Sequence, residues 1–548
     1  MKKILMSTVL CVAGLMLSGC EDFLETTKYG GSTTWESQSD VDKALTALYS
    51  FTTNDSEGIT GQGIMWFECC SDNMTVGRNE PEADQIRNFK MTPSNGINVQ
   101  DNWKMMYEVN AKANNIIKIV PTMNLDPNYT SYAVGTAYFF RGLAMLWIAP
   151  YYGDHEFNGG IPIILDTTEP ALMDAPRPKS VLQNYDQIIS DMRTAGDKLP
   201  LFSELPPEKY GMPHKAAAWA FGARAALYAA QFDEKYYNTV IELCDKVMQL
   251  SGADRRDLYD DYTTDTFHNL WRKEQNFGCE YLFSLLGSPV DGPKFHGMSF
   301  QNGGWGLYNH WGYYQPTLSL WNAYEEGDIR RDATIIYPGQ HIQFMGNDVV
   351  FGGEGTCTDR WGSYTKVFDI SSDTGMSFCK FLSPWEKADC KGKDVSTNGN
   401  NASNTLGTCL IRFADVLLMK AEALIWLNGE GDSEAKQLLN RIRSRAHLPQ
   451  NSMATKRELK NERRCELAFE FMPSRHLDLV RWGDAQETYA KPTQRISSHW
   501  DYSTSEVVFD GVSNYDEGRH FDPQINQVFP IPIKAFDGTV YLKQNKGY

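Results

Sequence analysis

The chain has 548 residues, a formal net charge of −17 at pH 7, and contents of 42% hydrophobic and 22% charged residues. This composition is typical of a globular protein, and the length is sufficient for a large hydrophobic core. The acidic balance argues against a nucleic-acid partner, because nucleic-acid binding requires a basic surface.

The N-terminus has the pattern of a bacterial export signal. Lys2 and Lys3 precede an apolar run from Ile4 to Leu17, which is short for a membrane span. The run ends in Leu17-Ser-Gly-Cys20, which matches a lipobox. We predict a signal peptide over 1–19, lipidation of Cys20 and a tether over 20–36, with several acyl chains giving stable anchoring. The alternative is an ordinary secretory cleavage site beside a chance cysteine.

Helical periodicity dominates two regions, about 37–250 and about 410–483. The segment Ser131–Ile148 is apolar on nearly every face, so this helix should be buried all round and its Arg141 should need an acidic partner. The other expected helices of the first region are Ser39–Ser50, Val99–Ile119, Val181–Leu199, His214–Ala230 and Tyr237–Leu250.

The second helical region begins with an antiparallel pair. One apolar stripe runs from Leu410 to Leu424 and a returning stripe from Ala435 to Ala446, separated by a Gly-rich turn at Asn428–Asp432. The pair has about the length of a tetratricopeptide unit. The sequence therefore predicts a mainly α fold of tetratricopeptide-like helical repeats laid side by side.

Periodicity fails between about 254 and 409. The stretch is rich in Gly, Asn, Asp and aromatic residues, with short strand-like pieces such as Tyr281–Leu285 and one clear helix at Pro316–Tyr324. So long an irregular connection is unusual in a compact domain. We therefore expect a large loop-rich lobe with a functional role.

The cysteines do not form a complete disulfide set. Of the eleven, Cys11 leaves with the signal and Cys20 is acylated, which leaves an odd number. Cys379 and Cys390 could close a loop, while Cys244 and Cys465 lie in helical patterns and are expected in the core. The Cys and His spacing does not resemble a zinc site, so we predict no metal and no cofactor.

Acids and arginines alternate in the C-terminal segment 459–483. Such mixed charge on a largely apolar helix predicts a neutralised ion-pair network that joins helices to a second layer, a structural role rather than a catalytic one. Pro473 is expected to end the helix. The charged residues are Glu462, Arg463, Arg464, Glu466, Glu470, Arg475, Asp478 and Arg481.

This segment resembles the C-terminal signature of the RagB/SusD family of outer-membrane lipoproteins. In the family a Glu-Arg-Arg-x-Glu-Leu-x-x-Glu helix leads into Arg-x-x-Asp-Leu-x-Arg-Trp-Gly, and here two extra residues separate Glu470 from Arg475. The runs Ala137–Met145, Gly160-Ile-Pro-Ile163 and Pro316–Asp328 are also similar to the family. The resemblance covers the mature chain and implies one SusD-like domain over 37–548.

The resemblance also implies a function. SusD-like proteins bind glycans at the cell surface without catalysis and act as lids over a TonB-dependent transporter barrel, into which they pass oligosaccharides. The expected partners are thus a SusC-like transporter and an oligosaccharide or polysaccharide. The expected location is the outer membrane, surface-exposed, with lipidated Cys20 as the only membrane attachment.

An aromatic-rich loop is the predicted glycan site. Between residues 300 and 314, rings alternate with glycines in neither strand nor helical spacing. A flat ring matches the apolar C–H face of a sugar, and amide and imidazole groups can bond its hydroxyls. Alternatively, the rings form a cluster that pins the loop onto the helices. The candidates are Trp305, Tyr308, His310, Trp311, Tyr313, Tyr314, Asn302 and Asn309, with Trp66 in another loop.

The sequence contains no established catalytic motif. There is no His-Glu-x-x-His, no Gly-x-x-x-x-Gly-Lys phosphate loop and no Gly-x-Ser-x-Gly elbow. We therefore predict that the protein is not an enzyme. Two alternatives stay open: a surface glycoside hydrolase, whose opposed carboxylates one sequence cannot exclude, and a tetratricopeptide-type scaffold for protein interactions.

Overall fold

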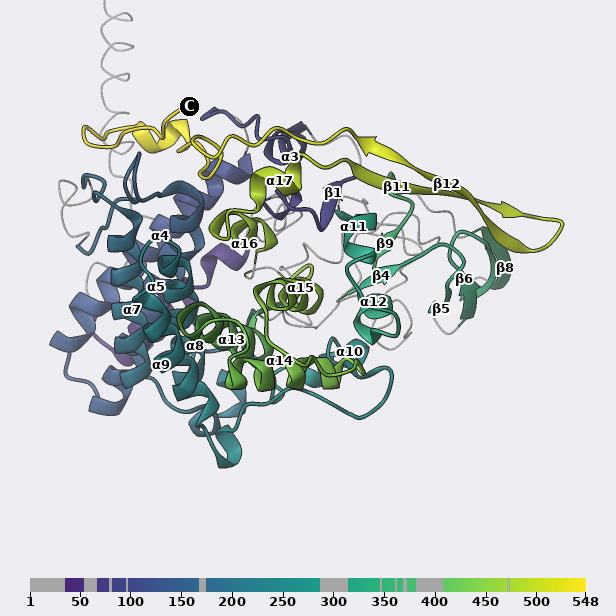
Figure 1. The fold of residues 1–548 in the computed structure, drawn as a ribbon. Coiled ribbons are helices and arrows are strands. Elements are labelled where there is room, and N and C mark those ends of the chain that lie inside the picture. The colour runs from purple at the N-terminus through teal and green to yellow at the C-terminus, as the bar shows by residue number, and fades with distance from the viewer. Residues whose placement is uncertain are drawn as a thin grey trace, which may run out of the picture.

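The computed structural model describes residues 35–53, 67–77, 81–94, 97–166, 174–285, 314–344, 347–359, 362–367, 372–380, 408–470, 472 and 474–548. Figure 1 shows the long helices on one side of the molecule and most of the strands on the other, with α13 to α16 between them. A long hairpin of β11 and β12 extends along one edge. No helix within these ranges is both long and apolar enough to cross a membrane.

The long helices pack against one another in chain order, from α4 to α9. Helix α9 then packs against α13, although the whole irregular lobe separates them in the sequence. This arrangement confirms the predicted mainly α, tetratricopeptide-like fold. The helices of the row are α4 (Ile97–Ile119), α5 (Pro127–Tyr152), α7 (Val181–Lys198), α8 (Lys215–Ala230), α9 (Tyr236–Met248), α13 (Phe413–Asn428) and α14 (Ser433–Arg445), and α2 (Gln38–Ala47) lies against α4 and α5.

Helix α5 packs between α4 and α7 in the row. It begins at Pro127, after an Asp126 side chain that accepts hydrogen bonds from two backbone N–H groups, and it is buried along most of its length, as predicted. The expected partner of Arg141 is Asp191, whose carboxylate accepts two hydrogen bonds at 2.8 and 2.7 Å. This bidentate pair neutralises a charge that would otherwise be costly to bury.

The lobe between about 254 and 409 contains more regular structure than predicted. Strand β2 (Tyr281–Leu285) was expected, but the helix predicted over Pro316–Tyr324 is only the single turn α11 (Leu318–Trp321). The other short helices are α10 (Thr266–Asn269) and α12 (Ile329–Thr334), and the strands are β3 (Tyr314–Pro316), β4 (Ile335–Ile336), β5 (His341–Phe344), β6 (Asn347–Val350), β7 (Glu354–Asp359), β8 (Gly362–Val367) and β9 (Ser377–Phe378).

The antiparallel sheet β5-β6-β7-β8 was missed by the prediction. The entry and exit of the lobe lie side by side, because β10 (Thr408–Arg412) pairs antiparallel with β2, with Arg412 opposite Tyr281. Strand β10 leads directly into α13. The lobe is thus an insertion between α9 and α13, and the strands near its start and at its end, β2 and β10, are paired with each other.

The C-terminal region contains α15 (Lys456–Leu467), α16 (Arg475–Arg481), α17 (Ala485–Tyr489) and the hairpin strands β11 (Thr493–Asp501) and β12 (Glu506–Asp516). Helix α15 ends at Leu467, well before Pro473, so the prediction that Pro473 ends it is wrong. The side chains of Lys380 and Arg412 donate to the carbonyl oxygen of Glu466 at the end of α15, at 3.2 and 2.8 Å. These two side chains thereby donate hydrogen bonds to a carbonyl oxygen at the helix end, where the helix itself offers no further N–H donors.

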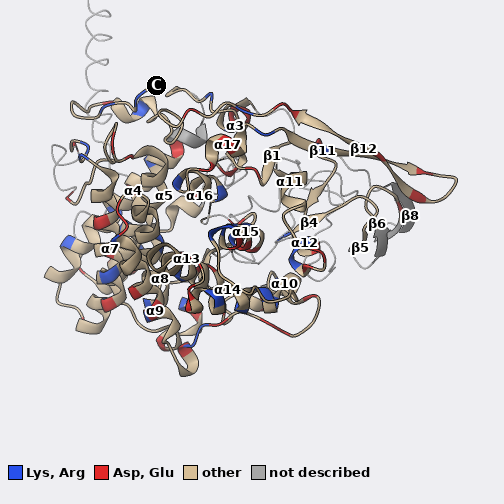
Figure 2. Ribbon diagram, in the orientation of Figure 1, with Lys and Arg blue, Asp and Glu red and all other residues tan. Residues whose placement is uncertain are grey.

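The predicted ion-pair network is present, and its centre is Glu466 on α15. The Glu466 carboxylate is 0% exposed and pairs with three arginines that come from three other elements. These are Arg330 of α12, Arg412 of β10 and Arg445 of α14. Figure 2 shows the blue and red positions side by side along α15. The network therefore joins the helical row to the lobe, which is the predicted structural role.

The remaining charged residues of the signature are also paired. Asp415 on α13 binds Arg224 and Arg463. Glu422, two turns further along α13, binds Arg481. Glu470 binds both Arg412 and Lys380. Glu462 pairs with Arg330 and Arg443, Asp478 pairs with Arg463 and Arg481, and Asp72 pairs with Arg464 and Arg475.

The cysteines whose side chains the structure describes are free, namely Cys69, Cys70, Cys244, Cys279, Cys379, Cys409 and Cys465. Cys244 and Cys465 are buried in the core, as predicted. Cys379 is also buried, and its proposed disulfide partner Cys390 lies outside the described residues. Cys20 lies outside them as well.

Glu68 gives the fold a testable pH dependence. Its buried carboxylate accepts hydrogen bonds from Ser474 and from the backbone at the start of α16. Burial raises the pKa of Glu68 to about 7, from an ordinary value of 4.5. The protonated form is therefore favoured in the folded state, so this group's stabilisation is complete below pH 4.5 and is lost as the pH rises through 7.

We expect Glu68→Gln to flatten the fall in melting temperature between pH 5 and pH 8. The wild-type group accounts for roughly 3 kcal/mol of unfolding free energy across that interval. Thermal melts at both pH values, with the exposed Glu208→Gln as a matched control, measure the difference. Parallel pH profiles for the wild type and Glu68→Gln would contradict the assignment.

Candidate functional site

Most of the predicted site residues lie outside the described part of the chain. These are Trp66, Asn302, Trp305, Tyr308, Asn309, His310, Trp311 and Tyr313. Tyr314 is described and is 1% exposed, in β3 opposite Val76 of β1 (Met74–Val76). Its interpretation as a surface ring is wrong, because strand pairing places its side chain in the main core.

The β1–β3 pair connects the two candidate loops to the fold. Strand β3 directly follows residue 313, and η2 (Phe67–Cys70) and β1 follow Trp66. The antiparallel pairing places Met74 opposite Pro316, so the chain leaving each loop enters the same small sheet. The paired strands β1 and β3, which we call the frame, bring together segments that are more than two hundred residues apart in the sequence.

This frame is tied to the ion-pair network. The Thr317 hydroxyl donates to the carbonyl oxygen of Asp72 at 2.6 Å. The Asp72 side chain in turn accepts from Arg475 and pairs with Arg464. Burial acts to raise the pKa of Asp72, but the two guanidinium groups outweigh it and hold that pKa well below its usual range. The charged Asp72 side chain and the Asp72 backbone carbonyl therefore tie the β1–β3 pair to α15 and α16.

A second group of aromatic side chains comes from α11, from the segment after β4 and from β12. We call its three members, Trp321, Tyr337 and Phe509, the aromatic row. The rings of Trp321 and Tyr337 stack with centroids 4.3 Å apart and an interplanar angle of 26°. Phe509 follows at 5.3 Å from Tyr337 and is 48% exposed. The Arg331 guanidinium covers Trp321 at 4.4 Å from the ring centroid.

The hairpin holds Phe509 in the row by packing across the lobe. Ile496 N–H donates to the carbonyl oxygen of Thr374 at 2.9 Å, and Trp500 lies against Gly353. A Cβ at Gly353 would come within 2.5 Å of the indole of Trp500, so only glycine permits this contact. Trp500 and Phe509 lie on the same face of the hairpin, because Trp500 is directly opposite Val507 and Phe509 is two residues further along that strand.

Stacked, partly exposed rings beside a guanidinium can bind a ring-shaped ligand with an apolar face and hydroxyl groups. Sequence reasoning missed this group because its members come from α11, the segment after β4, and β12. Trp321 lay within a predicted helix, and no sequence signal pointed to Phe509. Among the residues that the structure describes, no three His, Cys, Asp or Glu side chains are placed to hold a metal ion.

Two family models match the chain. One described as the SusD family matches residues 297–548, and one described as starch-binding, associating with the outer membrane, matches residues 22–227. A SusD-like protein of Formosa agariphila is 25% identical over 466 residues, which cover 79% of this chain and 81% of that protein. A second SusD-like protein of the same organism is 24% identical over 501 residues, covering 89% and 92% of the two chains.

Solved structures share the fold over nearly the whole chain. A SusD-like protein from Bacteroides fragilis superposes with a TM-score of 0.74 at 21% identity, covering 94% of this chain and 98% of that one. A laminarin-binding SusD-like protein gives 0.68 at 20% identity, covering 94% and 100%. Surface glycan-binding protein A from Bacteroides thetaiotaomicron, in complex with laminarihexaose, gives 0.66 at 16% identity, covering 93% and 99%.

Proposed function

This chain belongs to the SusD family, and on that basis we propose that it is a non-catalytic glycan-binding lipoprotein of the cell surface. It captures an oligosaccharide or polysaccharide and delivers it to a SusC-like TonB-dependent transporter in the outer membrane. The observation that carries the glycan assignment is the aromatic row, in which Trp321, Tyr337 and Phe509 lie against one another and Arg331 covers Trp321. The predicted loop 300–314 runs into β3, whose first residue is Tyr314, and the aromatic row begins at α11, which follows β3 after a single residue.

The names of related proteins support a carbohydrate ligand. Solved structures of the same fold include a laminarin-binding protein and a surface glycan-binding protein with laminarihexaose. Both ligands are glucans, so glucan oligosaccharides are the first probes to use. Isothermal titration of the full mature chain with a glycan panel tests the proposal, and absence of binding to every glycan at millimolar concentration would contradict it.

The enzyme alternative has a separate test. A glycoside hydrolase needs two carboxyl groups that face each other across the sugar. The network acids described above are instead neutralised by arginine or lysine, as Glu466 and Glu470 are. Incubation of the protein with its bound glycan would release products if the hydrolase alternative were right.

The scaffold alternative rests on the row of helices, which resembles folds that bind peptides in a groove. The aromatic row lies outside that helical row, on the lobe and the hairpin, and this favours glycan binding over peptide binding. A protein that binds no glycan but retains a peptide ligand would favour the scaffold.

Anchoring at Cys20 is part of the same proposal, with residues 20–36 as the tether and 37–548 as one domain. One buried hydrophobic cluster containing residues from Val41 to Ile531 supports the single domain. We expect Cys20→Ala to move the protein from the membrane fraction to the soluble fraction, because acyl chains contribute about 0.8 kcal/mol per buried CH₂. Fractionation of cells expressing each form measures this, and an unchanged membrane fraction would contradict lipid anchoring.

The aromatic row yields its own prediction. We expect Trp321→Ala to weaken glycan binding several-fold, because it removes one stacking ring and the partner of Arg331. Titration with laminarihexaose measures the change, with Trp426→Ala on α13 as a control in the helical row. Equal affinities for Trp321→Ala and the wild type would remove the row from the binding surface.

A further inference from the structure

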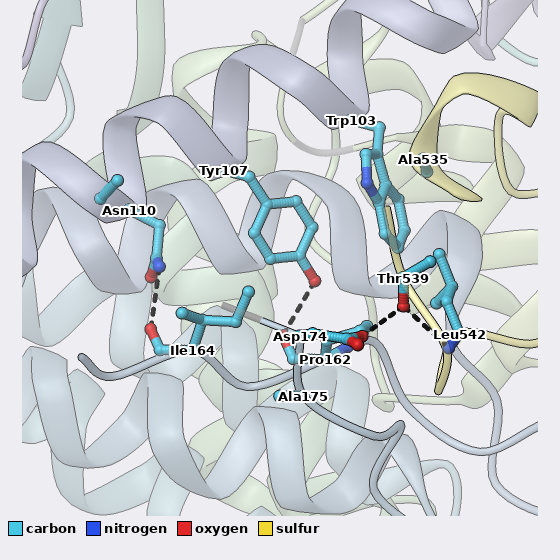
Figure 3. A pocket seen from close by; sticks show the side chains of 11 residues that line it. Trp103, Tyr107, Asn110, Pro162, Ile164, Asp174, Ala175, Ala535, Thr539 and Leu542 are labelled. Carbon is cyan, nitrogen blue, oxygen red and sulfur yellow. Dashed lines mark hydrogen bonds between the residues drawn. The ribbon is translucent and has the colours of Figure 1, made fainter. Parts of the chain in front are cut away.

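A cavity of about 220 Å³ lies between α4 and the C-terminal segment of the chain (Figure 3). None of the described residues that line it belongs to the aromatic row. Its walls are chiefly apolar, and Trp103 and Tyr107 contribute the two aromatic rings. The volume is below the roughly 300 Å³ at which sites for drug-sized ligands begin, so the cavity suits a single ring rather than a chain.

Helix α4 provides one wall. Trp103, Tyr107 and Asn110 recur at helical spacing and therefore lie on one face of α4. The rings of Trp103 and Tyr107 have centroids 5.0 Å apart. The Tyr107 hydroxyl donates to the carbonyl oxygen of Pro162 at 2.8 Å, and Asn110 Nδ2 donates to that of Ile164 at 2.9 Å (Figure 3). This wall is therefore fixed without a ligand.

The C-terminal segment provides the opposite wall. The Thr539 hydroxyl donates to the Asp174 carboxylate and accepts from the backbone N–H of Leu542 at 3.2 Å. The N–H of Val540 also donates to Asp174, at 3.0 Å. These hydrogen bonds, that from Thr539 first, lower the pKa of Asp174, which is a carboxylate at neutral pH.

Two hydrogen-bond acceptors, the Asp174 carboxylate and Asn110 Oδ1, belong to the described lining residues, which include no lysine or arginine. Asn110 Oδ1 is buried and has no hydrogen-bond partner in the described part of the chain. A buried acceptor without a hydrogen-bond partner destabilises the folded protein, and a donor group on a ligand would remove that cost. A ligand for this cavity therefore needs hydroxyl donors, an apolar face and no negative charge.

We propose that the cavity is a second carbohydrate site, which takes one neutral sugar ring. A sugar hydroxyl donates to Asn110 Oδ1, and the rings of Trp103 and Tyr107 cover the apolar face of the sugar. The choice of carbohydrate rests on the proposed function. The location of the site does not, because it follows from the lining residues alone.

The test is saturation-transfer NMR of the full mature chain with glucose, galactose, mannose and xylose, each at millimolar concentration. At least one of these sugars is expected to bind. Asn110→Leu removes the acceptor, and Ala175→Trp fills the cavity, so each should weaken that binding at least about tenfold. Circular dichroism establishes that each variant is folded, and Asn110→Leu decides the outcome if Ala175→Trp does not fold. Tyr262→Ala, at an exposed ring outside the cavity, the aromatic row and the loop 300–314, should leave monosaccharide binding unchanged.

Each failure has a distinct meaning. If laminarihexaose binds but no monosaccharide does, the second site is overturned and the proposed function stands. If neither these monosaccharides nor any member of the glycan panel binds, both proposals are overturned. If monosaccharide binding is lost in Trp305→Ala/Trp311→Ala but kept in Asn110→Leu, the sugar occupies the other site, and this proposal is overturned. Displacement of the sugar by tetramethylammonium would assign the cavity to a cation instead.

Discussion

Glu466→Gln is expected to lower the free energy of unfolding by about 3–5 kcal/mol, the range found when one member of a buried ion pair is removed. The substitution keeps the shape of the side chain but leaves Arg330, Arg412 and Arg445 without their shared counter-charge. Each of these guanidinium groups is buried, so water cannot compensate for the loss. Urea denaturation followed by circular dichroism measures the change in unfolding free energy.

The pH dependence of this effect has a defined sign. Burial acts to raise the pKa of Glu466, but the arginines outweigh it and hold the pKa well below 4.5. The stabilisation from the charged carboxylate is therefore fully present above pH 4.5, and it is lost only as the pH falls through the lower folded-state pKa. The difference between wild type and Glu466→Gln should consequently stay constant from pH 7 down to about pH 5.

The matched control is Glu487→Gln, the same chemical change at an acid whose side chain is 84% exposed. Glu487 forms an ion pair with Lys491 at the surface, and such pairs contribute at most about 1 kcal/mol. If Glu466→Gln unfolded at the same urea concentration as Glu487→Gln, Glu466 would not be the centre of the network.

The network shows how far the sequence could be interpreted. The alternation of acids and arginines around α15 correctly indicated buried, neutralised charge. The identity of the partners could not be predicted, because Arg330 and Arg412 lie in the lobe and at its exit, far from Glu466 in the sequence. The helices of the row were predicted within a few residues because apolar periodicity is a local signal.

The strands were harder to predict because their signals are weak and their partners distant. Strands β5 to β8 are short and polar, and the hairpin connects through Tyr502–Ser505, which lacks the Asn-Gly or Asp-Gly signal of a tight hairpin turn. The wrong placement of Tyr314 has the same cause. Its burial depends on pairing with Val76, a contact that no local pattern specifies.

The sequence indicates the loop 300–314, which stays a prediction, but it does not indicate the aromatic row. A run of rings between glycines is visible in the sequence, so the loop 300–314 could be singled out. The aromatic row could not, because Trp321, Tyr337 and Phe509 meet only after the hairpin has packed across the lobe. Residues that form a surface through tertiary contacts leave no motif.

The second large effect is expected for Trp305→Ala/Trp311→Ala. Removal of an aromatic side chain from the centre of a binding surface costs about 2 kcal/mol or more, so the double variant should lose at least about 30-fold in affinity for laminarihexaose. Isothermal titration measures this loss. Tyr262→Ala is the control, since Tyr262 is 88% exposed and belongs to neither the loop nor the aromatic row.

The melting temperature distinguishes the two roles that the rings of this loop can have. Rings that form a platform for a sugar contribute little to folding, so the double variant should lose affinity while it melts with the wild type. Rings that pin the loop onto the helices contribute buried area, and their loss should lower the melting temperature by several degrees, because about 1 kcal/mol shifts it by roughly 2 °C or more in a large domain. Lost affinity together with lost stability would therefore favour the cluster, and retained affinity would contradict the site.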